Sequence, residues 1–206
     1  MNKSSNKDIL VSKAFEMFKN YGYDQTSISS IRKEAGVSNG TFYHYFKTKE
    51  DLLIAVCLQE MNIYDLKDNM EDKAADPEKH LTAYFLSWGK YFESLGVNIV
   101  SQVYRIFNTV FIDSASNEVH SIKKIWQTHQ LEQFIEMAQK KGTLRTDYSA
   151  KEYSRLLFML TRGILFEWIL QPDKVDLEET AKRYLPIIIN ELYPSKFYSA
   201  QSPPDA

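Results

Sequence analysis

The sequence contains a single cysteine, Cys57, so no disulfide can form within the chain. This favours a reducing compartment such as the cytoplasm, and the apolar run around Cys57 indicates a small core residue rather than a nucleophile. Only seven glycines and six prolines occur among 206 residues, which argues against collagen-like and turn-rich all-β chains. The first residues lack the apolar segment of a signal peptide.

Long hydrophobic runs are also missing. The most apolar stretch, residues 156–170, is interrupted by Arg162 and Glu167. It is also shorter than the roughly 20 residues that a membrane-spanning helix needs. We therefore expect no membrane partner.

Catalytic patterns are scarce as well. The four histidines, at positions 44, 80, 120 and 129, show no metal-binding spacing. We find no glycine-rich phosphate loop and no plausible pair of nucleophile and base. The sequence therefore predicts a protein that is not an enzyme and that has no metal or cofactor.

Charge is spread unevenly along the chain. Residues 1–56 carry eight Lys or Arg and six Asp or Glu, net +2, whereas residues 57–206 carry seventeen and twenty-one, net −4. The asymmetry is small, but it is compatible with an N-terminal part that meets a polyanion.

Helix signals occur throughout the chain, and no segment alternates like a strand. Ser5 with Asp8, Thr48 with Asp51, and Ser149 with Glu152 have the spacing of capping boxes. Pro186 should kink the last helix, and residues 194–206 look disordered. We predict an all-α chain with helices over residues 6–21, 27–35, 39–45, 49–70, 77–95, 97–111, 118–141, 150–170 and 177–193.

Residues 27–46 have the layout of a helix-turn-helix. Two short helices are joined by a turn at Gly36, Val37 supplies an apolar plug, and Ser38 begins the second helix. In DNA-binding proteins of this layout the second helix enters the major groove. The alternative is a surface helical hairpin with chance aromatic residues.

The second helix and the residue directly after it carry four aromatic residues and a histidine in five consecutive positions. Phe42 and Phe46 are four residues apart and can share the inward face. Asn39, Gly40, Thr41, Tyr43 and His44 are then left facing outward. The Tyr43 and Tyr45 hydroxyls can reach phosphate oxygens, and Lys47 and Lys49 lie at the start of the next helix, where N–H groups favour an anion.

The stretch TSISSIRKEAGVSNGTFYHYFKTKEDLL resembles the DNA-binding signature of the TetR (tetracycline repressor-like) family of bacterial transcription regulators. The segments KKGTLRTDYSAKE and EWILQPDKVDLEE resemble, more loosely, those that flank the penultimate helix in that family. The resemblance implies that Asn39 and Thr41 read bases, and that Ser27, Tyr45 and Lys49 fix phosphates. The complete set expected at the DNA is Ser27, Ser29, Ser38, Asn39, Gly40, Thr41, Tyr43, His44, Tyr45, Lys47 and Lys49.

One position departs from the family pattern. Members usually carry a small residue, typically Ala, directly after the Ile31 position, where the two helices cross, but this chain has Arg32. We expect its guanidinium to extend outward. Either the crossing is wider or Arg32 itself reaches a phosphate.

We expect three parts along the chain: a DNA-binding domain over residues 1–50, a helical ligand-binding and dimerisation domain over 51–193, and a tail over 194–206. The last two helices are apolar around too much of their circumference for surface helices. They are either an internal pair or one half of a four-helix bundle with a second copy, and the resemblance favours the dimer. The expected interface residues are Leu157, Leu160, Gly163, Ile164, Trp168, Tyr184 and Ile188.

Most aromatic residues between the helix-turn-helix and the last two helices are interpreted as core. The resemblance, however, implies a cavity for a small effector, and an aromatic lining with a few polar groups suits one. His129 and Arg162 are the polar residues that the sequence embeds most clearly in apolar faces. Arg162 forms either an ion pair or a clamp on an effector carboxylate. The expected pocket residues are Trp88, Tyr91, Tyr104, Phe107, Phe111, Trp126, His129 and Arg162.

Together these features predict a ligand-responsive homodimeric repressor, released from a palindromic operator by a small apolar or aromatic effector. Activation in place of repression stays open. The rival interpretation is a helical protein-interaction adaptor that does not bind specific DNA.

Overall fold

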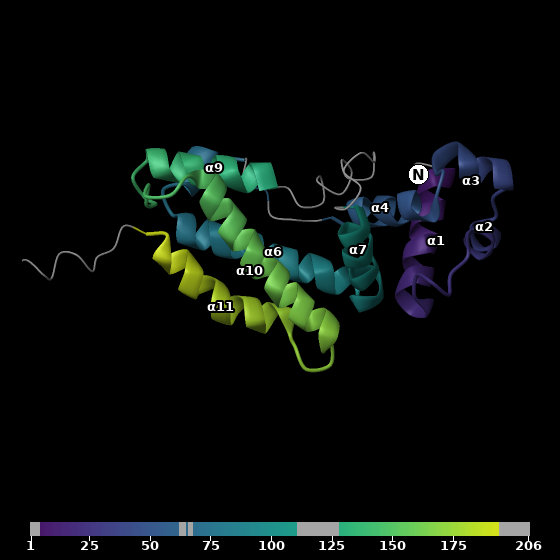
Figure 1. Cartoon of the computed structure of the whole chain (residues 1–206). Coiled ribbons are helices and arrows are strands. Elements are labelled where there is room, and N and C mark those ends of the chain that lie inside the picture. Colours follow the sequence, from purple (N-terminus) through teal and green to yellow (C-terminus); the bar gives the residue numbers. More distant parts are fainter. Residues whose placement is uncertain (1–4, 62–64, 66–67, 111–127, 194–206) are drawn as a thin grey trace, which may run out of the picture. The chain divides into compact units, whose positions relative to one another are not determined.

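The computed structural model describes residues 5–61, 65, 68–110 and 128–193 of the chain (Figure 1). Every regular element within these residues is a helix, as predicted. None of these helices has the length and apolarity to cross a membrane. The helices are α1 (Asn6–Tyr21), α2 (Ile28–Ala35), α3 (Asn39–Tyr45), α4 (Lys49–Gln59), α5 (Met70–Lys73), α6 (Pro77–Leu95), α7 (Val97–Val110), α9 (Thr128–Lys140), α10 (Ala150–Leu170) and α11 (Leu177–Glu191).

The chain divides into two compact units. Unit 1 comprises residues 1–62, 90–127 and 168–172, and unit 2 comprises residues 63–89, 128–167 and 173–206. Helix α6 is therefore shared, since residues 77–89 belong to unit 2 and residues 90–95 to unit 1. The division by function, with DNA binding in residues 1–50 and ligand binding in 51–193, stays a prediction.

Helix starts follow the capping patterns of the sequence. Ser5 and Asp8 form a capping box at α1, and Thr48 and Asp51 form another at α4, both as predicted. The Asp176 carboxylate accepts a hydrogen bond from the Glu179 N–H and so caps α11. These side chains satisfy N–H groups that the first helical turn leaves without partners.

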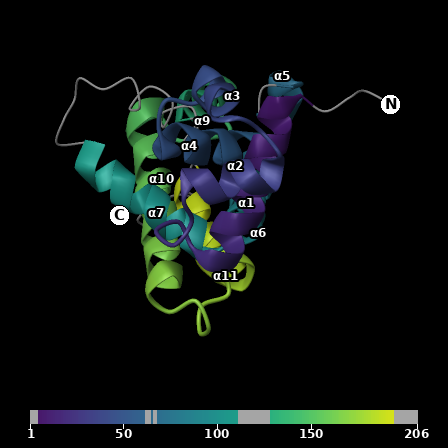
Figure 2. The same ribbon diagram turned by 90° about the vertical axis from the view of Figure 1, so that its right-hand side faces the viewer.

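Unit 1 is built around α1. Helices α2, α3, α4 and α7 all pack against α1, and α1 to α4 lie next to one another in both views (Figures 1 and 2). The α1 side chains Leu10, Ala14 and Phe18 are completely buried, as is Leu53 of α4. The bidentate ion pair between Arg105 and Asp24, with N–O distances of 3.0 Å, joins α7 to the segment after α1.

The fourth helix is shorter than predicted. The sequence suggested a helix towards Met70, but α4 ends at Gln59, with Glu60 as its C-cap. Asn and Asp are poor helix formers, and Asn62, Asp65, Asp68 and Asn69 follow within ten residues. Asn69 has a left-handed backbone, with φ of 50°, so a continuous helix cannot pass through it.

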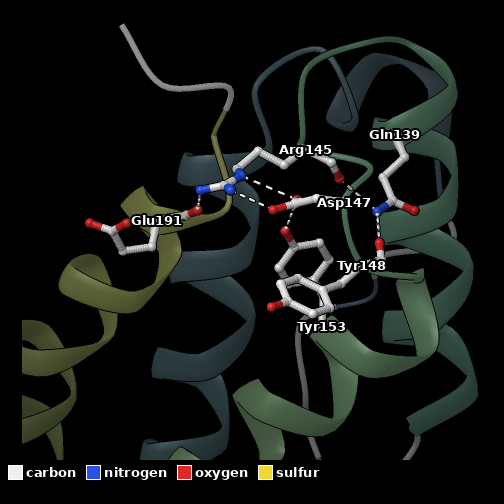
Figure 3. Close-up of polar contacts among 6 residues, drawn as sticks. All are labelled: Gln139, Arg145, Asp147, Tyr148, Tyr153 and Glu191. Carbon is white, nitrogen blue, oxygen red and sulfur yellow. Dashed lines mark hydrogen bonds and ion pairs between the residues drawn. The ribbon is translucent and has the colours of Figure 1, made fainter. Parts of the chain in front are cut away.

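In unit 2, the connection between α9 and α10 holds the end of α11 (Figure 3). The Arg145 N–H donates to the Leu192 carbonyl oxygen at 2.8 Å, and the Arg145 guanidinium pairs with the Asp147 carboxylate. The Tyr153 hydroxyl donates to the same carboxylate at 2.6 Å. Gln139 donates to the carbonyl oxygens of Arg145 and Tyr148, at 2.7 and 2.9 Å. These contacts tie the ends of three helices together.

Candidate nucleic-acid interface

Helices α2 and α3 form the predicted helix-turn-helix. The Ser27 side chain caps α2, and Gly36 ends α2 in the left-handed region with φ of 66°. That backbone favours glycine because it has no Cβ. The Ser38 hydroxyl then accepts the Thr41 N–H at 3.1 Å and begins α3. The sequence thus specifies where both helices begin and where the turn lies.

One face of α3 is anchored in unit 1. Phe42 and Phe46 are buried as expected, with ring centroids 5.9 Å apart, and Ile31 of α2 is also completely buried. Burying a phenylalanine side chain contributes about 1.5–3 kcal/mol to stability. The anchored rings therefore fix which face of α3 is turned away from the unit.

The opposite face of α3 is open. Tyr43 and Tyr45 are 51% and 37% exposed, although a core normally takes up such rings. The Thr41 side chain is half-buried, and its hydroxyl lies 2.8 Å from that of Ser38. The contact of these residues with DNA stays a prediction, but each has the accessibility that it requires. The other expected contact residues that are exposed are Ser27, Ser29, Ser38, Asn39, Gly40, His44 and Lys47.

Gly40 has no internal reason to be glycine. Its φ lies outside the left-handed region, and among the described residues an added Cβ would meet only the Ser38 hydroxyl oxygen, at 3.9 Å. Glycine in a helix costs about 1 kcal/mol relative to alanine. Glycine would be favoured here if a partner molecule came close to the backbone of α3.

Lys49 differs from the expectation that it fixes a phosphate. Its ammonium group donates to the Tyr23 carbonyl oxygen and lies 3.9 Å from the centroid of the Tyr23 ring. Desolvation lowers the pKa of Lys49, and nearby Asp24 and Glu50 oppose that shift. In this structure Lys49 is therefore engaged inside unit 1, whereas Lys47 is exposed.

The sequence predicts that Arg32 extends outward, with a wider crossing or a phosphate contact as the consequence; the structure gives it a partner within the helix-turn-helix. One terminal guanidinium N–H group donates to Oδ1 of Asn39 at 2.7 Å. The Arg32 Nε is buried and has no hydrogen-bond partner among the described residues. The side chain therefore lies along the helix crossing and reaches the first residue of α3, a contact that no spacing rule predicts.

The expected effector residues fall into both units. Trp88, in unit 2, is completely buried, and Tyr91, in unit 1, is 3% exposed. Tyr104 is half-buried. Phe111 and Trp126, together with the Phe107 side chain, lie outside the described residues. The expectation that His129 and Arg162 are embedded is wrong for the single chain, because both side chains are exposed.

Unit 2 holds buried polar atoms that the sequence did not single out. The hydroxyl of Tyr84 and Oε1 of Gln130 are buried without a hydrogen-bond partner among the described residues. Gln130 also donates from Nε2 to the Asp65 carboxylate. Burial raises the pKa of Tyr84, so its phenol stays neutral. A buried polar atom without a partner costs about 1–3 kcal/mol, which a polar group of a ligand would offset.

The expected dimer interface needs correction. Leu157 is completely buried and Trp168 is 8% exposed, so both belong to the core of the single chain. Leu160 and Ile164 are half-buried and Gly163 is exposed, so the exposed face of α10 agrees with the expected set only in part. It carries Leu156, Met159, Gly163, Phe166 and Leu170, spaced by three or four positions.

Helix α11 repeats this pattern. Tyr184 and Ile187 are 45% and 58% exposed, and Ile188 is half-buried. Leu177, Ala181, Leu185 and Ile189 are the buried positions of the same helix. Both helices thus present an apolar face that the described residues leave exposed.

Comparison with known proteins gives a family match for the helix-turn-helix. Residues 10–56 match the family model described as bacterial regulatory proteins, tetR family. The Fatty acid metabolism regulator protein of Bacillus subtilis (strain 168) is 24% identical over 190 residues. This alignment covers 89% of this chain and 94% of that protein.

Two solved structures share the fold over nearly the whole chain. The transcriptional regulator FadR from Bacillus subtilis, in complex with stearoyl-CoA, superposes with a TM-score of 0.67 at 20% identity, covering 90% of this chain and 98% of that one. SmeT, the repressor of the Stenotrophomonas maltophilia multidrug efflux pump SmeDEF, gives 0.68 at 18% identity, covering 98% and 97%. At these identities the likeness establishes the fold.

Proposed function

Because this chain belongs to the TetR family of bacterial regulatory proteins, we propose that it is a ligand-responsive, DNA-binding transcriptional repressor. The observation that carries this function is α3. Its Phe42 face is buried, whereas its opposite face exposes Asn39, Tyr43 and His44. A short helix anchored in this way suits the major groove, where side chains meet base edges and phosphates. Such a regulator would act in the cytoplasm.

The dimer is the second part of the proposal. A palindromic operator presents two half-sites about one DNA turn apart, roughly 34–36 Å, and a two-fold dimer matches that symmetry. The exposed apolar faces of α10 and α11 are what a second copy would cover. Gly163 supports the pairing, because no described residue has an atom within 4 Å of the place where its Cβ would be.

The effector is the third part. We propose a small molecule with an apolar or aromatic body, bound in unit 2, where Trp88 and Phe158 stack edge to face with centroids 5.9 Å apart. The buried hydroxyl of Tyr84 would receive one polar group of that molecule. Stearoyl-CoA is the first probe to try, because the FadR structure from Bacillus subtilis contains it.

A helical adaptor that does not bind specific DNA is the competing function. The exposed apolar faces of α10 and α11 could bind a partner protein of such an adaptor as well as a second copy of this chain. An electrophoretic mobility-shift assay with DNA flanking the protein's own gene separates the two. A repressor shifts that DNA in the presence of excess random DNA, and the effector reverses the shift. No shift beyond that of random DNA would favour the adaptor.

A further inference from the structure

The contact between Arg32 and Asn39 determines what α3 can read. Arg32 lies on α2 and Asn39 is the first residue of α3. A guanidinium group has only N–H donors, so it can face only the oxygen of the Asn39 amide. The 2.7 Å distance is that of a charge-assisted hydrogen bond. The orientation of the amide is therefore fixed by chemistry: Oδ1 faces Arg32, and Nδ2 is the free end.

The free end presents donors only. Asn39 is exposed at the beginning of α3, whereas Phe42 of the same helix is buried. Guanine offers two acceptors, N7 and O6, in the major groove, whereas adenine offers one acceptor and one donor. Asparagine usually reads adenine with both ends of its amide at once. Here the Asn39 oxygen is turned towards the Arg32 guanidinium, which takes one of its two lone pairs, so the amide is not free to place both of its ends on adenine.

We propose that Arg32 determines the DNA specificity of this protein by holding Asn39 as a donor-only reader, so that the base opposite Asn39 is guanine. Arg32 is a positioning residue, since the amide of Asn39 makes the base contact. The buried Nε of Arg32 supports this role, because a side chain held at the helix crossing cannot swing out freely to a phosphate. The inference rests on the proposed function, namely that α3 enters the major groove.

The experiment begins with selection of binding sites from a randomised duplex pool by the full-length protein. The variants are Arg32→Ala, Asn39→Ala and Asn39→Asp, with Lys33→Ala as the matched control, because Lys33 is an exposed cation next to Arg32 on α2. We expect the unaltered chain to select one G·C pair at a fixed position of each half-site. Arg32→Ala should change that position towards adenine and leave the others unchanged. Lys33→Ala should keep the selected sequence.

Affinities for operators that carry guanine or adenine at this position then quantify the effect. The unaltered chain should prefer guanine on the order of tenfold, and Arg32→Ala should abolish or reverse that preference. Asn39→Asp retains an oxygen for Arg32 but has no donors, so it should lose the preference too. If Asn39→Asp kept the guanine preference, Arg32 would be reading the base itself and the proposal would be overturned.

Three further outcomes are decisive. A uniform loss of affinity for all sequences in Arg32→Ala would make Arg32 a phosphate contact and overturn the proposal. Effects of Arg32→Ala and Asn39→Ala at different base positions would overturn it as well. If the unaltered chain selects no motif at all, the proposed function fails, and this inference fails with it. Should Arg32→Ala not fold, as judged by thermal unfolding, Arg32→Met keeps the aliphatic stem without the charge and replaces it in every measurement.

Discussion

The ammonium group of Lys49 lies over the ring of Tyr23, 3.9 Å from its centroid, and donates to the carbonyl oxygen of the same residue. The Tyr23 hydroxyl in turn donates to the Glu50 carboxylate at 2.8 Å. Together these contacts join the N-terminus of α4 to the segment after α1. Lys49 therefore stabilises the packing of the helices that support α3. Its charge is less available to a DNA phosphate than its position in the sequence suggests.

The first prediction separates Lys49 from Lys47. Lys47→Ala should weaken binding to specific and random DNA alike and flatten the dependence of log affinity on log salt by about one unit. Lys49→Ala should leave that slope unchanged and lower the free energy of unfolding by about 1 kcal/mol, since it removes a cation–π contact and a hydrogen bond. Salt-dependent fluorescence anisotropy and urea unfolding measure the two effects. A slope that flattens for Lys49→Ala would return this residue to the DNA surface.

Lys49 shows what the sequence can and cannot predict. Capping pairs such as Thr48 with Asp51 act between residues three positions apart, so the sequence alone located the starts of α1 and α4. Long side chains are different, because Arg32 and Lys49 can each reach several partners. Only the tertiary structure decides that they meet Asn39 and Tyr23.

The dimer surface shows the same limit in another form. Helices α10 and α11 are apolar on several faces, so periodicity alone could not tell the buried row from the exposed one. The buried row contains Leu157, and the exposed row contains its neighbour Leu156. Successive side chains along a helix point in directions about 100° apart, because a full turn takes 3.6 residues. An error of one position therefore exchanges a buried row for an exposed one.

The second prediction concerns the open face of α3. Tyr43→Phe removes one exposed hydroxyl and keeps the ring that packs against Phe42, with centroids 5.2 Å apart. A lost hydrogen bond is worth about 1 kcal/mol, so operator affinity should fall roughly fivefold. Tyr148→Phe is the matched control, since Tyr148 is an equally exposed tyrosine in unit 2. Equal affinity of both variants would remove the Tyr43 hydroxyl from the DNA contacts.

The third prediction concerns self-association. Met159→Asp places a charge on the exposed face of α10, and Ile187→Asp does so on α11. Burying an uncompensated carboxylate is costly, so the dimer dissociation constant should rise on the order of a hundredfold. Sedimentation equilibrium measures this dissociation constant, with Tyr148→Asp as the exposed control.

Leu157→Ala should instead cost about 2–5 kcal/mol of folding stability, because Leu157 is a core residue. If Met159→Asp and Ile187→Asp stay dimeric, these faces are not the interface.

The fourth prediction concerns acid stability. The hydrogen bond from Tyr153 and the guanidinium of Arg145 lower the pKa of Asp147 below its ordinary value of 3.8. A depressed carboxyl pKa stabilises the fold above the unfolded value, and this contribution is lost as pH falls through the folded value. Asp147→Asn should therefore lower the melting temperature at pH 7 by on the order of 2 °C and have a smaller effect near pH 3.

The control for acid stability is Asp173→Asn, an exposed carboxylate near the start of α11. It should leave the melting temperature nearly unchanged at both pH values. A difference between Asp147→Asn and the unaltered chain that is as large near pH 3 as at pH 7 would mean that the carboxylate charge is not the cause. Burial and the Asp147 contact also raise the pKa of Tyr153 to about 12, so the phenol remains a donor throughout this range.

The last prediction concerns communication between effector and DNA. Tyr91, in the part of α6 that belongs to unit 1, donates from its hydroxyl to the Cys57 carbonyl oxygen at 3.0 Å. Cys57 lies in the last turn of α4, where carbonyl groups lack partners within the helix. The first part of α6 belongs to unit 2 and carries Trp88. A shift of α6 caused by an effector would therefore pull on the end of α4.

Tyr91→Phe removes this hydrogen bond and keeps the ring in the core. We expect it to reduce the coupling between effector and operator, which in such switches amounts to about 1–3 kcal/mol. By linkage the two ligands weaken each other by the same factor, so stearoyl-CoA, or the effector once found, is titrated against free and operator-saturated protein. The ratio of the two affinities should lie closer to one in Tyr91→Phe than in the unaltered chain, with Tyr148→Phe as control. An unchanged ratio would place the coupling route elsewhere, whereas a ratio of one in the unaltered chain would leave a DNA-binding dimer without a switch.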